Sequence, residues 1–235
     1  RSSSSRSSSS RRSSSSGSSS GRSGSSSGGN ATYRDADDGL IDPWLKTISF
    51  WNGDKPLLAL HSYATHPMSY YGRGGVTSDF VGLARAKRHR DDFSITQIYV
   101  SGCSGDVTAG KYNDGSPDNR PVLANRIYKG MKQAWEKTRK IPVTTVQFRN
   151  TTLQLKFNDH EKFAAAALKT TLEDKKQDVR ERILAAMGLS SLQRIAKGQA
   201  IDMPCIDFGD AQILLFPGEA FVGYQLMAQK MRPTS

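Results

Sequence analysis

The sequence predicts an α/β domain, with a mixed sheet and flanking helices, that is preceded by a disordered Ser/Arg-rich tail. Short apolar runs typical of buried strands alternate along the chain with stretches of helical periodicity. Three of the predicted strands lead into loops that carry polar residues: His61 and His66, Asp106 and Thr108, and Glu219. Because strand ends in α/β sheets converge on ligand sites, we expect the site at these strand ends.

Residues 1–30 form the predicted tail. They comprise 19 serines, five arginines, five glycines and one asparagine, with nothing apolar. Such a segment cannot bury enough surface to offset its chain entropy, so we predict that it is disordered. Residues 31–235 have about the size of one domain.

The charge of residues 31–235 argues against nucleic-acid binding by the folded part. The tail holds five of the 33 basic residues and no acid, which leaves 28 basic against 22 acidic residues. This part also lacks a basic strand face studded with the aromatic residues that stack on bases. The Arg/Ser tail could bind RNA loosely by charge, but its arginines are sparse, and we favour a simple low-complexity tract as the explanation.

The sequence gives little evidence for membrane insertion, export or disulfide bonding. No apolar run approaches 18 residues, so we expect no transmembrane segment, and no signal peptide is visible. Cys103 and Cys205 are too few to define a disulfide framework.

In the first half, alternation predicts a hairpin over 45–63 that turns at Asn52-Gly53-Asp54. A helix over 80–90 follows, capped by Ser78 or Asp79, and then a strand over 95–100. The next helix is predicted from one apolar face at helical spacing, formed by Leu123, Ile127, Met131, Ala134 and Trp135.

In the second half, residues 143–157 alternate with period two and predict strand, with a break near Asn150. Residues 160–198 predict a charged helical hairpin broken at 188–190. Residues 211–216 predict a buried strand, followed by a Pro-Gly turn and a helix that opens with Glu219.

The histidines and the glutamate suggest part of a zinc site, because zinc prefers imidazole nitrogen and carboxylate oxygen. His61 and His66 are five positions apart, which makes no strong local motif. Each is also explained as a hydrogen-bonded core or loop histidine. Glu219 is also explained as an ordinary acid in the first turn of a helix.

The glycine-flanked turn GCSGDVTAG offers Asp106 and Thr108. Its glycines allow a ligand close to the backbone, and a hydroxyl there can bind a substrate oxygen or act as a nucleophile. A plain turn containing aspartate explains the same residues. Cys103 is interpreted as core filling, and Tyr70 and Tyr71 either line an apolar cleft or stack in the core.

Three motifs together resemble the neutral/alkaline, non-lysosomal ceramidase family, in the version found in uncharacterised bacterial homologues. THPMSYYGRGGVTSDFVG is similar to the family's His-x-x-Ser stretch that continues to Ser-x-Asp-x-x-Gly. GCSGDVTAG is similar to its Gly-Asp-Val-Ser-Pro-Asn hexapeptide, and LLFPGEAF to its Pro-Gly-Glu-x-Thr motif. The order and approximate spacing agree across residues 33–232.

The resemblance implies a zinc amidohydrolase that cleaves an N-acyl amide of a ceramide-like lipid, with metal-activated water attacking the carbonyl. In that family two histidines, a glutamate and a tyrosine hold the zinc, and His66 and Glu219 match two of them. Thr108 stands at the position of the hexapeptide serine. The remaining matched or neighbouring site residues are Gly105 and Asp106 in the catalytic turn, and His61, Ser69, Tyr70, Tyr71 and Asp79 around the metal or the substrate. The resemblance also implies a secreted or periplasmic protein.

The sequence departs from the family's pattern in several places. Ser-Pro-Asn of the hexapeptide is Thr-Ala-Gly here, and the threonine of Pro-Gly-Glu-x-Thr is Phe221. The family's first zinc histidine and its ligand tyrosine have no match in this sequence. We therefore expect residues 31–235 to be a partial ceramidase-like catalytic domain, truncated at both ends. The alternative is a non-catalytic remnant of the same fold that binds a lipid or carbohydrate.

Overall fold

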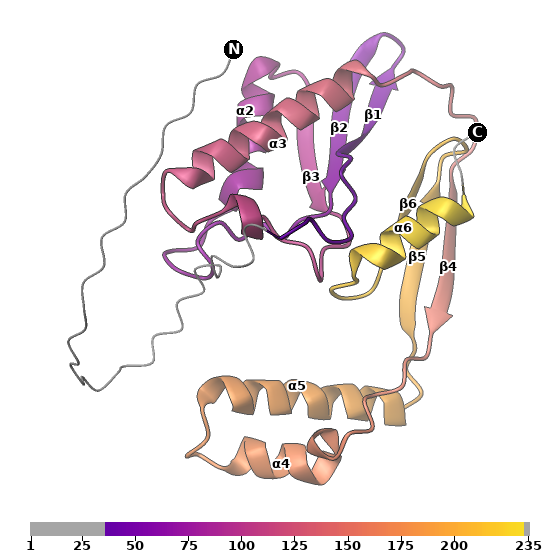
Figure 1. Cartoon of the computed structure of the whole chain (residues 1–235). Coiled ribbons are helices and arrows are strands. Elements are labelled where there is room, and N and C mark those ends of the chain that lie inside the picture. The colour runs from indigo at the N-terminus through magenta and orange to yellow at the C-terminus, as the bar shows by residue number, and fades with distance from the viewer. Residues whose placement is uncertain (1–35, 233–235) are drawn as a thin grey trace, which may run out of the picture.

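The structure is a computed structural model that describes residues 36–232, so the predicted tail at residues 1–30 lies outside the described residues (Figure 1). In chain order the elements are β1 (Lys46–Asn52), β2 (Lys55–Tyr63), α2 (Asp79–Asp91), β3 (Thr96–Ser101), the 3-10 helix η1 (Gly110–Tyr112), α3 (Asn119–Glu136), β4 (Gln147–Leu153), the 3-10 helix η2 (Glu161–Phe163), α4 (Ala165–Glu173), α5 (Val179–Ala196), β5 (Ile201–Asp207), β6 (Gln212–Leu214) and α6 (Val222–Met231). The predicted α/β class, with a mixed sheet and flanking helices, is confirmed.

The first sheet has the order β1-β2-β3 and is mixed. β1 and β2 form the predicted antiparallel hairpin, with a register shift between Phe50 and Trp51. β3 pairs parallel to β2, so both strands point their carboxyl ends in the same direction. This parallel pairing places the loops after β2 and β3 at one edge of the sheet.

Helices α2 and α3 pack together over one face of this sheet (Figure 1). The predicted apolar face of α3 is confirmed, because Leu123, Ile127 and Met131 are buried in the main core with residues of α2. Trp135, at the end of the same face, stacks on Trp51 of β1 with ring centroids 5.5 Å apart.

The start of α2 is capped in part as predicted. The Asp79 carboxylate accepts a hydrogen bond from the Phe80 amide at 2.6 Å, whereas the Ser78 side chain makes no capping bond. Asp79 has a φ of 53°, a left-handed conformation that is uncommon outside glycine but tolerated by aspartate.

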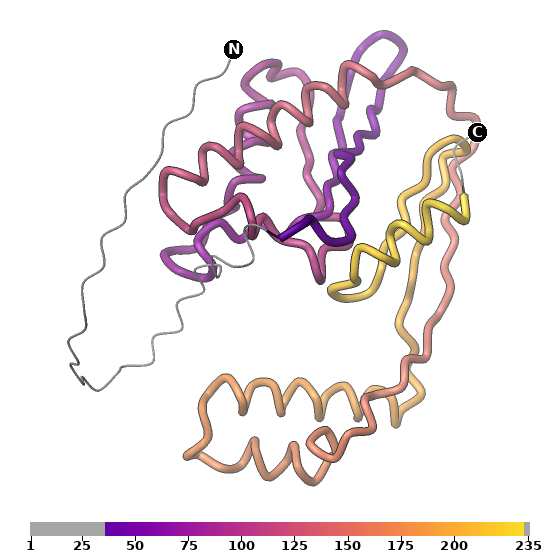
Figure 2. The backbone as a smooth tube through the Cα atoms, viewed as in Figure 1, coloured from indigo at the N-terminus to yellow at the C-terminus, as the bar shows by residue number. Residues whose placement is uncertain are grey.

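A second, antiparallel sheet has the order β4-β5-β6. Sequence patterning missed β5, whose segment IDMPCID contains Pro204 and lacks a clean alternation. The predicted break near Asn150 is wrong, because β4 pairs with β5 in one continuous register. The Asn150 side-chain Nδ2 instead donates to the Asp202 carboxylate across the two strands, at 2.7 Å. Figure 2 shows these two strands running side by side toward the α4–α5 hairpin.

The helical hairpin is confirmed, but its predicted break at 188–190 is wrong. The turn falls between Glu173 and Val179, and Gly188 lies buried inside α5. A Cβ added at Gly188 would lie 2.8 Å from Leu168 Cδ1 of α4. The glycine therefore allows α4 and α5 to approach closely and does not end the helix.

Helix α6 begins at Val222, so the prediction that Glu219 opens this helix is wrong. Glu219 lies in the loop between β6 and α6, after Gly218, whose φ is 70°. Within residues 36–232, no helix combines the length and the hydropathy that crossing a membrane requires.

Candidate functional site

A cavity of about 750 Å³ lies between the two sheets. One wall comes from the first sheet, with Ile48, Leu60 and Val100, and the opposite wall from the second sheet, with Ile213 and Leu214. The polar lining residues that the sequence singled out are His66 and Glu219, which are accompanied by Lys46, Gln225, Gln229 and Arg232. The volume falls within the range of small-molecule sites in proteins.

His66 and Glu219 meet at this cavity although 153 positions separate them in the sequence. His66 Nε2 lies 3.5 Å from Glu219 Oε1. The Glu219 side chain is 83% exposed and that of His66 is 27% exposed. The pair is therefore reachable from solvent and from the cavity.

The loop after β3 contacts both partners of this pair. On one side, the His66 amide donates to the Val107 carbonyl at 2.9 Å, and His66 pairs with Thr108 in a short parallel bridge. On the other side, the Gly105 amide donates to the Ala220 carbonyl at 3.0 Å, next to Glu219. The ends of β2, β3 and β6 thus meet in one place, which the sequence could only suggest.

The donor atoms of the pair fit one edge of a zinc site. His66 Nδ1 lies 3.3 Å from the Val107 carbonyl oxygen, so a proton on Nδ1 can donate there and leave the lone pair of Nε2 free to accept a metal. Two ligand atoms on a tetrahedral zinc are about 3.4 Å apart, close to the 3.5 Å observed. Within residues 36–232, no group of three or more His, Cys, Asp or Glu residues could hold a metal ion. The described residues therefore supply two donors of the three or four that zinc takes.

Thr108 and Asp106 lie beside the cavity and do not line it. Both residues are exposed, and the Asp106 carboxylate accepts a hydrogen bond from the Val222 amide at 2.8 Å. Cys103 does line the cavity. Burial, with a smaller contribution from the Asp106 charge, raises the pKa of its thiol, which disfavours the thiolate that a nucleophile needs.

His61 lies on the opposite face of β2 from the cavity and is fully buried. Its Nδ1 lies 2.7 Å from Thr47 Oγ1 and its Nε2 lies 2.9 Å from Gln97 Oε1, so both ring nitrogens have partners within the sheet. Burial lowers the pKa of His61, an effect that the Gln97 bond opposes and the charge of Arg88 reinforces.

We expect His61 to make the fold less stable at mildly acidic pH. Its pKa is lowered in the folded state, so the unfolded chain binds the proton more readily below about pH 6.5. Stability is then fully present above that pH and falls as the pH drops through 6.5 toward the folded pKa. Urea denaturation between pH 5 and 8 should show this slope, and His61→Asn should reduce it while lowering stability at every pH. His160→Asn, at an exposed histidine, is the control and should keep the slope.

The other residues predicted around the site form a separate polar cluster that anchors the loop after His66. Arg120 of α3 donates to Ser69 Oγ at 2.7 Å, and its guanidinium lies 3.4 Å from the centroid of the Tyr70 ring. The Ser69 amide donates to Asp79 at 2.9 Å, and the Tyr71 hydroxyl donates to a backbone carbonyl at 3.2 Å. Ser69, Tyr70, Tyr71 and Asp79 do not line the cavity.

Asp42 was missed in the sequence, where it reads as a turn residue before a proline. Its carboxylate is buried and forms an ion pair with Lys46, and it accepts hydrogen bonds from Gln225 at 2.6 Å and Gln229 at 2.9 Å. Burial raises the pKa of this carboxyl, but the bonds from Lys46, Gln229 and Gln225 and from the Trp44 amide outweigh it, and the net pKa is lowered. Asp42 thus holds three residues of the cavity lining.

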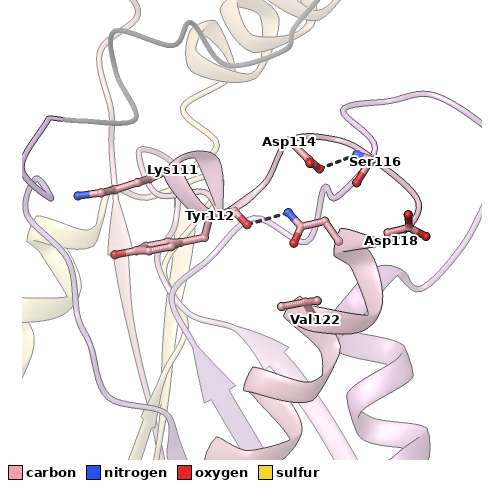
Figure 3. A pocket seen from close by; sticks show the side chains of 7 residues that line it. Lys111, Tyr112, Asp114, Ser116, Asp118 and Val122 are labelled. Atoms are coloured by element: carbon pink, nitrogen blue, oxygen red, sulfur yellow. Dashed lines mark hydrogen bonds between the residues drawn. The ribbon is translucent and has the colours of Figure 1, made fainter. Parts of the chain in front are cut away.

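A smaller polar hollow of about 350 Å³ lies at the surface, between η1 and the start of α3 (Figure 3). Within it, Asp114 accepts a hydrogen bond from the Ser116 amide at 2.9 Å, and Asn119 donates to the Tyr112 carbonyl at 2.8 Å. None of the site residues predicted from the sequence lines this hollow. We therefore place the candidate site at the larger cavity.

Comparison with known proteins supports the fold and no more. No protein-family model matches the chain, and no curated protein sequence does. The neutral ceramidase from Pseudomonas aeruginosa matches in structure with a TM-score of 0.56 at 15% identity, covering 85% of this chain and 38% of that one. A ceramidase complexed with C2 matches with a TM-score of 0.55 at 12% identity, covering 85% and 39%. The described chain therefore has a ceramidase-like fold and spans less than two-fifths of each of these proteins.

Proposed function

We propose that this protein is a zinc-dependent amidohydrolase that cleaves the N-acyl amide of a ceramide-like lipid to a fatty acid and an amine. The observation that carries the proposal is the His66–Glu219 pair, with donor atoms 3.5 Å apart, at an apolar-walled cavity. The ceramidase-like fold supports the choice of substrate class. The same resemblance leads us to propose a secreted or periplasmic location, which cell fractionation would test.

In this proposal His66 Nε2 and the Glu219 carboxylate would hold the metal. Zinc, when bound, lowers the pKa of a bound water to about 7 and polarises the amide carbonyl. The Val107 carbonyl orients the His66 imidazole through Nδ1. The apolar walls, including Ile48, Leu60 and Ile213, would bind the acyl chain and exclude water from it.

We expect the purified full chain to bind zinc, and His66→Ala to lose it. Removing a ligand should weaken zinc affinity by more than the 10–100-fold that loss of a supporting partner costs. Zinc per chain, measured by elemental analysis after dialysis, checks this together with hydrolysis of a fluorescent N-acyl amide. His160→Ala is the matched control, because His160 is exposed and does not line the cavity. Equal zinc in His66→Ala and the wild type would contradict the assignment.

The alternative is a non-catalytic domain of the same fold that binds a lipid or carbohydrate. The observation that favours it is the donor count, since residues 36–232 supply two metal ligands at the cavity. The apolar walls favour a lipid over a carbohydrate. Binding of a fluorescent fatty acid or ceramide analogue by the zinc-free protein, without turnover when zinc is added, would support this alternative.

A further inference from the structure

We propose that Asp106 is a positioning residue that sets Glu219 against His66, and that its carboxylate takes no part in proton transfer. The inference rests on the proposed function in one respect: the proposed function supplies the zinc that the His66–Glu219 pair would hold. The arrangement of Asp106 itself stands on hydrogen bonds in the described chain.

A hydrogen bond joins Asp106 to the start of α6. Asp106 Oδ1 accepts a hydrogen bond at 2.8 Å from the amide of Val222, the first residue of α6 and 116 positions away. The first amides of a helix have no partner within the helix, and Phe221, at the capping position, makes no side-chain capping bond. Asp106 therefore serves as the cap of α6 from a distant loop, where its negative charge also complements the helix dipole.

The loop that carries Asp106 also contacts both partners of the His66–Glu219 pair. The Gly105 amide donates to the Ala220 carbonyl, so Gly105 and Asp106 hold the chain at positions 220 and 222, directly after Glu219. The carbonyl oxygen of the next residue, Val107, accepts a hydrogen bond from the His66 amide at 2.9 Å and lies 3.3 Å from His66 Nδ1. Three consecutive residues thus connect the two donors, and a shift of this loop would change the distance between them.

The Asp106 carboxylate lies outside the cavity where the substrate would bind. Asp106 does not line the cavity, whereas His66 and Glu219 do. A proton donor or acceptor must come within hydrogen-bond reach of the reacting atoms. The Asp106 carboxylate therefore serves to bind the Val222 amide and not to transfer protons to or from a substrate.

The test compares Asp106→Asn with Asp106→Ala. The asparagine oxygen can still accept the Val222 amide, whereas alanine cannot. We expect zinc affinity and amide hydrolysis to stay within about threefold of the wild type in Asp106→Asn, and zinc affinity to fall by about tenfold or more in Asp106→Ala. A carboxylate that transferred protons would lose hydrolysis equally in both variants.

Hydrogen exchange of residues 219–224 in the zinc-free protein gives a readout that needs neither metal nor activity. We expect this segment to exchange about tenfold faster in Asp106→Ala and at the wild-type rate in Asp106→Asn, because a lost cap opens the first turn of the helix. If wild-type protein binds no zinc, the proposed function fails, and the exchange rates still decide the role of Asp106.

Val222→Pro provides a second route if Asp106→Ala does not fold. Proline is tolerated at the first position of a helix and removes the amide that donates to Asp106. Because Val222 is fully buried, Val222→Ala is the control for the change in side-chain packing. Phe221, with φ −72° and ψ 152°, already has the backbone conformation that a following proline requires. Val222→Pro should behave like Asp106→Ala. Wild-type exchange and zinc affinity in Asp106→Ala or in Val222→Pro would overturn the proposal, as would identical losses in the alanine and asparagine variants.

Discussion

Replacing Gly105 with alanine is expected to destabilise the protein and to weaken zinc binding together. A Cβ at this position would lie 2.3 Å from the Glu219 carbonyl oxygen and 2.9 Å from Phe221 Cδ1. Because the closest atom belongs to the backbone, a side-chain rotation cannot relieve the clash, and the loop that carries Glu219 must move. Overpacking of this kind costs about 1–3 kcal/mol in the free energy of unfolding. Urea denaturation and zinc titration of Gly105→Ala measure the two effects.

Gly75→Ala is the matched control for this prediction. Gly75 is also a loop glycine, but an added Cβ there meets no atom within 4 Å and its φ is not positive. We expect Gly75→Ala to be neutral or to stabilise the fold by up to about 1 kcal/mol, because alanine restricts the unfolded chain. The interpretation of Gly105 is contradicted if the two variants show the same stability and zinc affinity.

Replacing Asp42 with alanine is expected to lower stability by about 2–4 kcal/mol, because a buried charged acceptor disappears and its donors lose their partner. One of these donors, Gln225, also uses its side-chain oxygen Oε1 to accept a hydrogen bond from the Cys103 amide at 2.9 Å. The variant should therefore loosen the contact between α6 and the loop after β3. Urea denaturation at pH 7 measures the loss, with Asp159→Ala at an exposed aspartate as the control.

Asp42 also predicts how stability depends on acid. Its pKa lies below the ordinary value of 3.8, so its contribution is present above about pH 4 and is lost as the pH falls through the folded pKa. The wild type should lose more stability than Asp42→Ala between pH 5 and pH 3. Parallel losses in the two proteins over this range would show that Asp42 contributes nothing to the acid sensitivity.

Local patterns predicted the elements whose packing follows from neighbours in the sequence. The hairpin of β1 and β2 follows from alternation around an Asn-Gly turn, and the buried face of α3 follows from apolar residues at helical spacing. The failures are also physical. The sequence predicted a helix break at Gly188. In the structure the helix continues, and the absence of a side chain at Gly188 makes room for Leu168 of the neighbouring helix. β5 escaped detection because its pairing with β4 and β6, and not its own alternation, makes it a strand.

The sequence by itself determined which residue types follow each strand, and these pointed to His61, His66, Glu219 and the loop containing Asp106. The family resemblance then favoured His66 over His61 as the ligand. Only the tertiary structure decided that His66 and Glu219 lie 3.5 Å apart, that His61 faces away from them, and that a buried Asp42 supports the cavity. Periodicity depends on contacts between residues two to four positions apart, which the sequence displays directly. A hydrogen bond that spans more than 100 positions depends on how strands and loops are placed together, and spacing along the chain carries no record of that.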